Sequence, residues 1–314
     1  MDKKPLIILT GPTSVGKTSL SLALAKAVNG EIISADSMQV YRYMDIGTAK
    51  IMKEEMQGVP HYLIDEFEPD EDFNVVRFQQ LTKQYMKQIY ERNKIPILVG
   101  GTGFYIQAVL NDIDFTENDT DTTYRKELEQ LLEEKGAEYL HEQLVALDPE
   151  SALAIHQNNS KRVIRALEFI KLTGDKISDH NEDQKKKESP YNFCYFVLNK
   201  DRAKLYETIN KRVDIMMKDG LLEEVKRLAS KGYSRDLVSM QGLGYKEILA
   251  YLEGEYTLEE AVDILKRDTR HFAKRQLTWF RREREVLWVD KDQYPSEEKL
   301  LEHLLEVLRE HAIL

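Results

Sequence analysis

The chain has 314 residues, of which 42% are hydrophobic, so it can form one large domain or a core domain with a second module. The longest apolar run near the N-terminus covers residues 6–9. This is far shorter than the ~20 residues of a spanning helix, and shorter than a signal-peptide core, so we expect a cytoplasmic protein. The single cysteine, Cys194, excludes an internal disulfide and Cys-rich zinc sites, and its apolar surroundings indicate an inert core thiol.

The charge balance, 45 basic against 55 acidic residues, gives a net charge of −10 and argues against indiscriminate binding of nucleic acid. Any contact with a polyanion must therefore use local patches. The strongest candidate is the segment 266–284, where eight Lys and Arg stand against Asp268 and Glu283, a local charge of +6. The opposite bias, at residues 117–121, indicates an acidic surface loop or linker.

The first predicted element is a strand at residues 5–10, an apolar run bounded by Pro and Gly, and a helix follows at 16–28. Further short apolar runs predict strands at 31–35, 61–65, 95–100, 193–198 and 286–289. Between them lie helical patterns, for example Phe78, Leu81, Tyr85 and Ile89. This alternation indicates an α/β fold with a mostly parallel sheet flanked by helices.

The pattern changes over residues 116–190, where no convincing strand occurs and two amphipathic helices are predicted, at 124–144 and 160–172. We interpret 116–190 as an inserted all-helical module, with a polar linker at 183–190. Long helices return at 202–218 and 221–231. The predicted organisation is therefore a core at 1–115, the module at 116–190, and a second part of the core at 191–314 with basic C-terminal helices.

A phosphate-binding loop (P-loop) is predicted directly after the first strand, where residues 11–18 match G-x-x-x-x-G-K-[ST]. It consists of Gly11, Pro12, Thr13, Ser14, Val15, Gly16, Lys17 and Thr18. The glycines let backbone N–H groups converge on an anion at a helix N-terminus, Lys17 adds a charge, and the Thr18 hydroxyl can bind Mg²⁺. The sequence thus predicts a site for at least two linked phosphates.

The fate of those phosphates stays open from the motif alone, because such loops support hydrolysis, phosphoryl transfer or retention of a leaving group. The run at residues 62–66, which ends in Asp65-Glu66, resembles a Walker B strand and keeps an ATP-dependent small-molecule kinase in view. In contrast, the strand 95–99 ends in Gly100-Gly101-Thr102-Gly103, without a carboxylate.

Several separated blocks resemble the bacterial tRNA dimethylallyltransferases, also called tRNA isopentenyltransferases. They include residues 11–18, 34–41, 44–50 (Met-Asp-Ile-Gly-Thr-Ala-Lys), 59–65, 99–105, 162–168 and 241–247, in family order over most of the chain. The resemblance implies a P-loop-type core that holds dimethylallyl diphosphate with Mg²⁺. It also implies transfer of the prenyl group to N6 of the adenosine beside the anticodon, at tRNA position 37. Prenyl transfer to free adenine nucleotides is a further alternative, for which the module and the basic segment would be unnecessary.

The resemblance assigns Asp36 as the base that accepts the proton of the amine, and Lys17, Thr102 and Arg212 as polar groups around the leaving diphosphate. From the residues alone, Thr102 could equally be the N-cap of a helix at 103–110. Contacts with the tRNA anticodon stem-loop are expected from Asp36, Ser37, Met38, Gln39, Thr102, Arg125, Lys161, Arg162, Arg165, Gly242, Gly244, Tyr245, Lys246, Arg270, Lys274, Arg275, Trp279 and Arg281. We expect a monomer.

Overall fold

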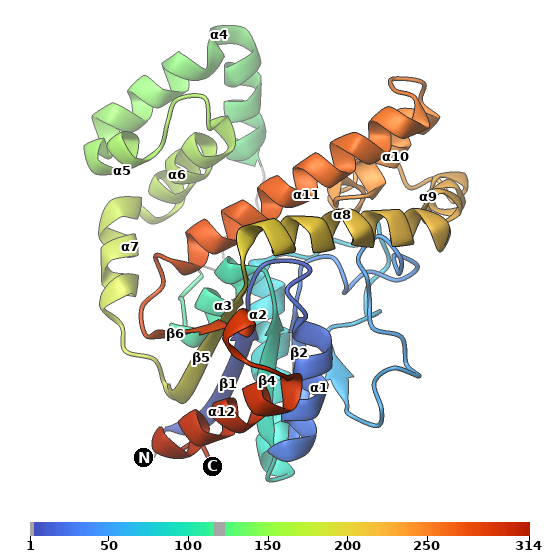
Figure 1. Cartoon of the computed structure of the whole chain (residues 1–314). Coiled ribbons are helices and arrows are strands. Elements are labelled where there is room, and N and C mark those ends of the chain that lie inside the picture. Colours follow the sequence, from blue (N-terminus) through green and yellow to red (C-terminus); the bar gives the residue numbers. More distant parts are fainter. Residues whose placement is uncertain (1–2, 116–122) are drawn as a thin grey trace. The chain divides into compact units, whose positions relative to one another are not determined.

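The computed structural model describes residues 3–115 and 123–314. It divides into two compact units, a core unit of Met1–Leu110 with Pro190–Leu314 and a helical unit of Asn111–Ser189 (Figure 1). The acidic segment predicted at 117–121 lies outside the described residues. Within the described chain, no helix is both long and apolar enough to cross a membrane.

The core unit is built on a six-stranded sheet in the order β3-β2-β4-β1-β5-β6, in which every pair of neighbours is parallel. The α/β fold expected from the sequence is thus confirmed. The strands are β1 (Lys4–Thr10), β2 (Gly30–Ala35), β3 (His61–Tyr62), β4 (Ile95–Gly100), β5 (Tyr191–Asn199) and β6 (Val286–Asp290).

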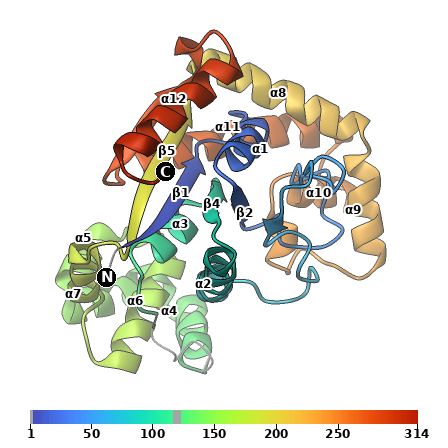
Figure 2. The same cartoon turned by 90° about the horizontal axis from the view of Figure 1, so that it is seen from below.

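Both faces of this sheet are covered by helices, which explains why its strands are almost continuously apolar. Alternate residues of β1 point to opposite faces: Leu6 and Ile8 pack into one buried cluster, Ile7 and Leu9 into another. The first cluster includes side chains of α2 and α3, and the second those of α1 and α12. Figure 2 shows the strands between these two pairs of helices.

Among the helices of the core unit, α8 has the predicted bounds, whereas α10 and α12 are not predicted as separate elements. The helices of this unit are α1 (Lys17–Ala27), α2 (Val75–Glu91), α3 (Gly103–Leu110), α8 (Arg202–Lys218), α9 (Leu221–Ser230), α10 (Tyr245–Leu252), α11 (Leu258–Phe280) and α12 (Glu297–Glu310), with short 3-10 turns η2 (Ser239–Gln241) and η3 (Lys291–Gln293). Gly220, with φ of 104°, separates α8 from α9.

One predicted strand is wrong in its extent, because only His61 and Tyr62 of the run 61–65 pair with β2. Leu63 and Asp65 have φ of 61° and 55°, and this left-handed backbone ends the strand. The Asp65 carboxylate instead accepts a hydrogen bond from the Lys50 ammonium at 2.5 Å.

The helical unit contains α4 (Thr123–Leu147), α5 (Pro149–Ala154), α6 (Ser160–Thr173) and α7 (Ile177–Lys186). A small core of its own holds it together, with Leu128, Leu140 and Leu144 of α4 against Val163 and Leu167 of α6. The linker predicted at 183–190 is wrong for 183–186, since α7 continues to Lys186.

Candidate active site at the carboxyl edge of the sheet

The candidate site begins where three neighbouring strands end at one edge of the sheet. Thr10 of β1 and Ala35 of β2 both lie in register with Gly100 of β4. The residues that follow these strands therefore leave the sheet side by side, which is where open α/β sheets bind ligands. They are the P-loop after β1, Asp36 after β2 and Gly101-Thr102 after β4.

The P-loop has the backbone that an anion-binding turn requires. Gly16, with φ of 89°, precedes the first residue of α1. Gly11 has φ of 143°, and a Cβ there would lie 2.5 Å from the Leu198 carbonyl oxygen of β5, so the loop can pass β5 only with glycine at this position. The N–H groups at the start of α1 thereby face the space above β1.

The Lys17 ammonium folds back over this loop and donates hydrogen bonds to the carbonyl oxygens of Gly11 and Pro12, both at 2.9 Å. Burial lowers the pKa of Lys17 to about 8; the Asp36 charge raises it, and Arg212 lowers it further. The same electrostatic group includes Arg212 of α8, whose pKa is lowered by burial and raised by Asp36. The structure thus brings Lys17, Asp36 and Arg212 into one electrostatic environment.

Asp36 and Thr102 form the second part of the site. The Asp36 carboxylate accepts a hydrogen bond from the Met38 N–H at 2.9 Å, and the Thr102 hydroxyl oxygen accepts one from the Ser37 N–H at 3.2 Å. The Thr102 N–H in turn donates to the Ala35 carbonyl oxygen at 3.1 Å. The Thr102 hydroxyl therefore bonds across to the loop after β2 and keeps a proton that it can donate to a ligand.

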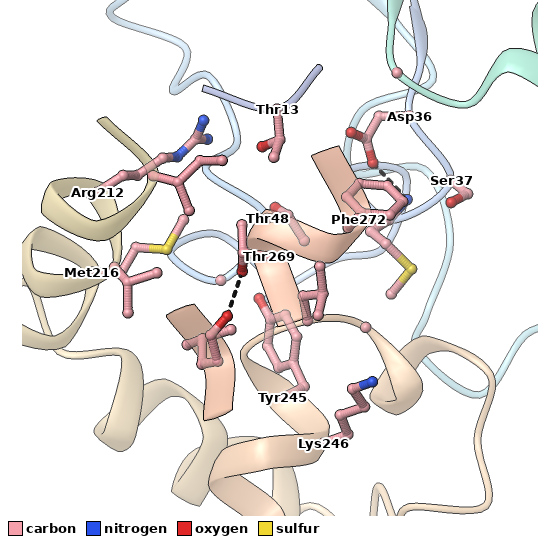
Figure 3. A pocket seen from close by; sticks show the side chains of 18 of the residues that line it. Thr13, Asp36, Ser37, Thr48, Arg212, Met216, Tyr245, Lys246, Thr269 and Phe272 are labelled. Atoms are coloured by element: carbon pink, nitrogen blue, oxygen red, sulfur yellow. Dashed lines mark hydrogen bonds between the residues drawn. The ribbon is translucent and has the colours of Figure 1, made fainter. Parts of the chain in front are cut away.

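A cavity of about 310 Å³ opens between these groups within the core unit. Thr13, Asp36 and Arg212 lie on one side of it, and Tyr245 and Lys246 on the other (Figure 3). Apolar side chains of α8 and α11 form much of the remaining wall: Ile209, Val213, Met216, Leu265 and Phe272. The cavity thus combines an anion-binding end, a carboxylate and an apolar wall.

The loop 45–47, which belongs to the Asp-Ile-Gly-Thr-Ala-Lys block, is fixed beside this cavity by Glu224 of α9. The Glu224 carboxylate is 1% exposed and accepts hydrogen bonds from the N–H groups of Asp45, Ile46 and Gly47 at 3.1, 2.9 and 3.1 Å. It also accepts one from the Tyr245 hydroxyl at 2.7 Å. The end of the block is held by buried Lys50, which donates to both Asp45 and Asp65.

The Walker B interpretation of residues 62–66 therefore loses its basis. Asp65 is bound to Lys50 and follows the edge strand β3, which β2 and β4 separate from β1 and the P-loop. The strand beside β1 is β4, and it leads into Gly101 and Thr102 without a carboxylate.

Further predicted residues of the core unit surround the cavity. Ser37, Met38, Gly242, Tyr245, Lys246 and Arg275 line it together with those described above. Gln39 lies just behind: its amide donates to the Thr48 carbonyl oxygen at 3.2 Å. Gly244 is the N-cap of α10, and its N–H donates a hydrogen bond to the Glu247 carboxylate at 2.8 Å.

The helix α11 is amphipathic, with one buried face and one exposed face that carries basic side chains. Phe280 is fully buried, whereas Phe272 lines the cavity. Lys274 and Arg275 are exposed, as is Arg281 just after the helix. Arg270 donates a hydrogen bond to Asn210 at 2.6 Å, and Trp279 packs edge-on against Phe104 with ring centroids 6.2 Å apart.

In the helical unit, the predicted RNA-binding residues gather around α6. Lys161 and Arg162 are exposed in its first turn. Arg125 and Arg165 both reach the buried Glu168 carboxylate, at 2.8 and 3.4 Å, so this carboxylate orients the two guanidinium groups.

Two residues that shape the site, Glu224 and Gln276, are not predicted by the sequence. Gln276 of α11 is 6% exposed and binds the P-loop through its amide. The available signal is weak: each is a polar residue on the apolar side of an amphipathic helix, where Val225 and Leu228 neighbour Glu224, and Ala273 and Phe280 neighbour Gln276.

Comparison with known proteins defines the class. The family model of the IPP transferases matches residues 39–283. The chain is 64% identical over 311 residues, 99% of both chains, to the tRNA dimethylallyltransferase of Lachnoclostridium phytofermentans. It is 54% identical over 305 residues, 97% of both chains, to that of Clostridioides difficile.

Solved structures agree with this assignment. The full-length tRNA isopentenylpyrophosphate transferase from Bacillus halodurans is similar with a TM-score of 0.73 and 47% identity, over 99% of this chain and 98% of that one. A eukaryotic dimethylallyltransferase acting on tRNA gives a TM-score of 0.84 and 31% identity, over 96% of this chain and 78% of that one. The chain belongs to the IPP transferase family.

Proposed function

We propose that this protein transfers the dimethylallyl group of dimethylallyl diphosphate to N6 of the adenosine next to the anticodon of tRNA, at position 37, and releases diphosphate. One observation carries the proposal: Thr13 of the anion-binding loop and the Asp36 carboxylate, both at the carboxyl edge of the sheet, line the same partly apolar cavity. In the reaction the allylic C–O bond breaks, the C–N bond forms, and the amine loses a proton.

Asp36 is the proton acceptor in this mechanism. An exocyclic adenine amine is a poor nucleophile because its lone pair is delocalised into the ring, so a carboxylate that takes the proton as the C–N bond forms assists it. The Met38 N–H fixes one Asp36 oxygen at 2.9 Å and leaves the other for the amine. The adenine must leave its stack to reach the cavity, as bases do in enzymes that modify them.

The leaving diphosphate accumulates negative charge as the C–O bond breaks, and donors fixed in advance stabilise that charge most effectively. The P-loop N–H groups, Lys17, Arg212 and the Thr102 hydroxyl supply such donors. The prenyl group itself carries no polar atom, so the apolar wall at Val213, Met216 and Phe272 suits it.

Mg²⁺ fits the chain at Thr18, which lies exposed in the first turn of α1 beside Lys17. The described residues contain no group of three or more His, Cys, Asp or Glu that could hold a metal. A single hydroxyl is the donor set expected for Mg²⁺ held mainly by water and by substrate phosphates. When bound, the ion would neutralise charge on the diphosphate.

A tRNA acceptor is supported by the names of the relatives and by the basic surface of α11, whose Lys274 and Arg275 are exposed next to the cavity. The helical unit offers further cations at Lys161 and Arg162. Such surfaces are unnecessary for a free adenine nucleotide. We place this reaction in the cytoplasm, carried out by a monomer.

The test is an assay with purified protein, Mg²⁺, dimethylallyl diphosphate and ATP, with and without unmodified tRNA. The label is placed either in the prenyl group or in the γ-phosphate of ATP. We expect prenyl label in tRNA only, at the adenosine next to the anticodon. Label from ATP in a small molecule would establish a kinase instead, and prenyl label in free adenine nucleotides would identify the other acceptor.

Asp36→Asn should lower transfer by roughly 100-fold or more, since general-base catalysis contributes about 10²–10⁴. The affinity for tRNA should change little. Asp70→Asn, at an exposed turn outside the cavity, is the matched control and should keep full activity. Near-normal turnover of Asp36→Asn would refute the role of this carboxylate.

A further inference from the structure

Gln276 is a buried amide in the middle of an otherwise basic helical segment. Its neighbours Lys274 and Arg275 are exposed, whereas Gln276 is 6% exposed. A buried amide must satisfy its hydrogen bonds within the protein, because leaving them unpaired costs free energy. Its partners therefore show what this position of α11 does.

Both ends of the Gln276 amide bind backbone groups of the candidate site. Its Oε1 accepts a hydrogen bond from the Thr13 N–H of the P-loop at 2.9 Å, and its Nε2 donates one to the Gly101 carbonyl oxygen at 3.0 Å. Thr13 follows β1 and Gly101 follows β4, the strand beside it. One side chain thus bridges the loop that would hold the diphosphate and the segment that carries Thr102.

This bridge requires an amide. The donor meets a carbonyl and the acceptor meets an N–H, so a carboxylate would place an oxygen against the Gly101 oxygen, and an apolar side chain would satisfy neither group. The fit is also close, since a Cβ at position 101 would lie 2.1 Å from Nε2. A side chain at position 101 would therefore displace the Gln276 amide from this position.

We propose that Gln276 is a positioning residue that sets the spacing between the diphosphate-binding loop and the Thr102 side of the cavity, and that links this spacing to the placement of α11. The inference rests on the proposed function. The breaking C–O bond and the attacking amine must be aligned, and small displacements of one side of such a site reduce the rate strongly. Gln276 acts through Thr13 and Gly101 and does not itself take part in the chemistry.

The chain offers a matched control in Gln79 of α2, which is also 6% exposed and donates from Nε2 to the Ala108 carbonyl oxygen at 2.7 Å. Gln79 lies outside the cavity. Substitution by Met preserves volume at either position and removes the amide. Both variants should lose thermal stability to a similar extent, but only Gln276→Met disturbs the site.

The experiment compares Gln276→Met, Gln79→Met and the wild type in single-turnover prenyl transfer at saturating tRNA, with the affinity for the anticodon stem-loop measured separately. We expect Gln276→Met to lower the transfer rate at least tenfold, with RNA affinity within about twofold of the wild type. A rate equal to that of Gln79→Met, or a loss confined to RNA affinity, would overturn the proposal.

Calorimetric titration with inorganic diphosphate and Mg²⁺ provides a readout independent of transfer. Gln276→Met should bind diphosphate roughly tenfold more weakly than Gln79→Met, because the hydrogen bond that positions the Thr13 N–H is lost. If the wild type transferred no prenyl group, the proposed function would fail, while this titration would still decide the role of Gln276. If Gln276→Met does not fold, Gln276→Glu is measured in the same way, because it keeps only the acceptor for the Thr13 N–H. A diphosphate affinity equal to that of Gln79→Met would again refute the proposal.

Discussion

Glu283, just after α11, is a carboxylic acid that the fold keeps close to its protonated state. Burial raises the pKa of Glu283 to about 7, and the indole of Trp279 lowers it only in part. The Tyr195 hydroxyl beside it is buried and has no hydrogen-bond partner among the residues that the structure describes. Ionisation of Glu283 therefore places a negative charge in a largely buried environment, which raises its pKa.

The stability of the protein should consequently depend on pH through this residue. The pKa of Glu283 in the folded state lies above that in the unfolded state, about 4.5. The protonated acid thus contributes stability that is complete below about pH 4.5 and is lost as the pH rises to about 7. Glu283→Gln carries no such proton, so its free energy of unfolding relative to the wild type should rise by about 1–2 kcal/mol from pH 4.5 to pH 8, after allowance for solvent access.

Urea denaturation of both proteins at pH 4.5, 6 and 8 measures this difference. Glu285→Gln, two residues further along and exposed, is the control and should show no such trend. A constant difference between Glu283→Gln and the wild type at all three pH values would show that Glu283 ionises as it does in the unfolded chain.

Site residues that belong to a local sequence pattern could be predicted from the sequence. Those whose role depends on a partner far away along the chain could not. The P-loop is a local pattern, and Asp36 and Thr102 each follow a predicted strand, so parallel pairing alone brings them together. Gln276 and Thr13 are 263 positions apart, and Glu224 and Ile46 are 178 apart. No local rule relates such pairs, because the tertiary packing of α9 and α11 creates them.

At the scale of elements, the loop 45–47 depends on helix α9 for its shape. Three consecutive N–H groups of this loop converge on the Glu224 carboxylate, and the Tyr245 hydroxyl completes the cluster. A Cβ on Gly47 would lie 2.5 Å from the Tyr245 ring, so the loop and α10 are in close contact. Gly47 and Thr48 then line the cavity.

Glu224→Gln should release this loop, because the NH₂ group of the amide would face hydrogen-bond donors, the loop N–H groups or the Tyr245 hydroxyl. We expect a loss of about 2–3 kcal/mol of unfolding free energy and a fall in kcat/KM for tRNA prenylation of about tenfold. Glu31→Gln is the matched control: Glu31 is 2% exposed, binds Arg92 and Lys94 at 2.6 and 2.8 Å, and lies outside the cavity. It should lose comparable stability while keeping its kcat/KM, and equal kinetic losses in both variants would argue against a specific role for the loop.

The regular elements were more predictable than their ends. Strands buried on both faces appear as uninterrupted apolar runs, and β4 begins and ends where such a run does. The run 61–65 looks the same in sequence, yet the strand ends after Tyr62, because Leu63 and Asp65 have left-handed backbone. The half-exposed Asp65 carboxylate binds the buried ammonium of Lys50, 15 positions away, and no local strand preference predicts this contact.

At the scale of the whole molecule, a net charge of −10 is combined with the basic segment 266–284, which begins within α11 and borders the cavity. The overall charge weakens long-range attraction to any RNA, so affinity depends on the few cations that contact phosphates directly. In the core unit, Lys274 and Arg275 are exposed on α11, and Arg275 borders the cavity. They are the residues through which this helix would bind the anticodon stem-loop.

Binding of an anticodon stem-loop should therefore weaken steeply with salt, and Lys274→Ala/Arg275→Ala should reduce that dependence. Each lost phosphate contact lowers the slope of log K against log salt by about 0.7–0.9, so the double variant should differ from the wild type by about 1.5. The control is Lys299→Ala/Arg309→Ala on α12, which removes two exposed charges from the helix that packs on α1. Fluorescence anisotropy from 50 to 300 mM salt measures the affinities and hence the slopes. If both double variants change the slope equally, Lys274 and Arg275 act only through net charge. The assignment of this face of α11 as an RNA-binding surface would then be wrong.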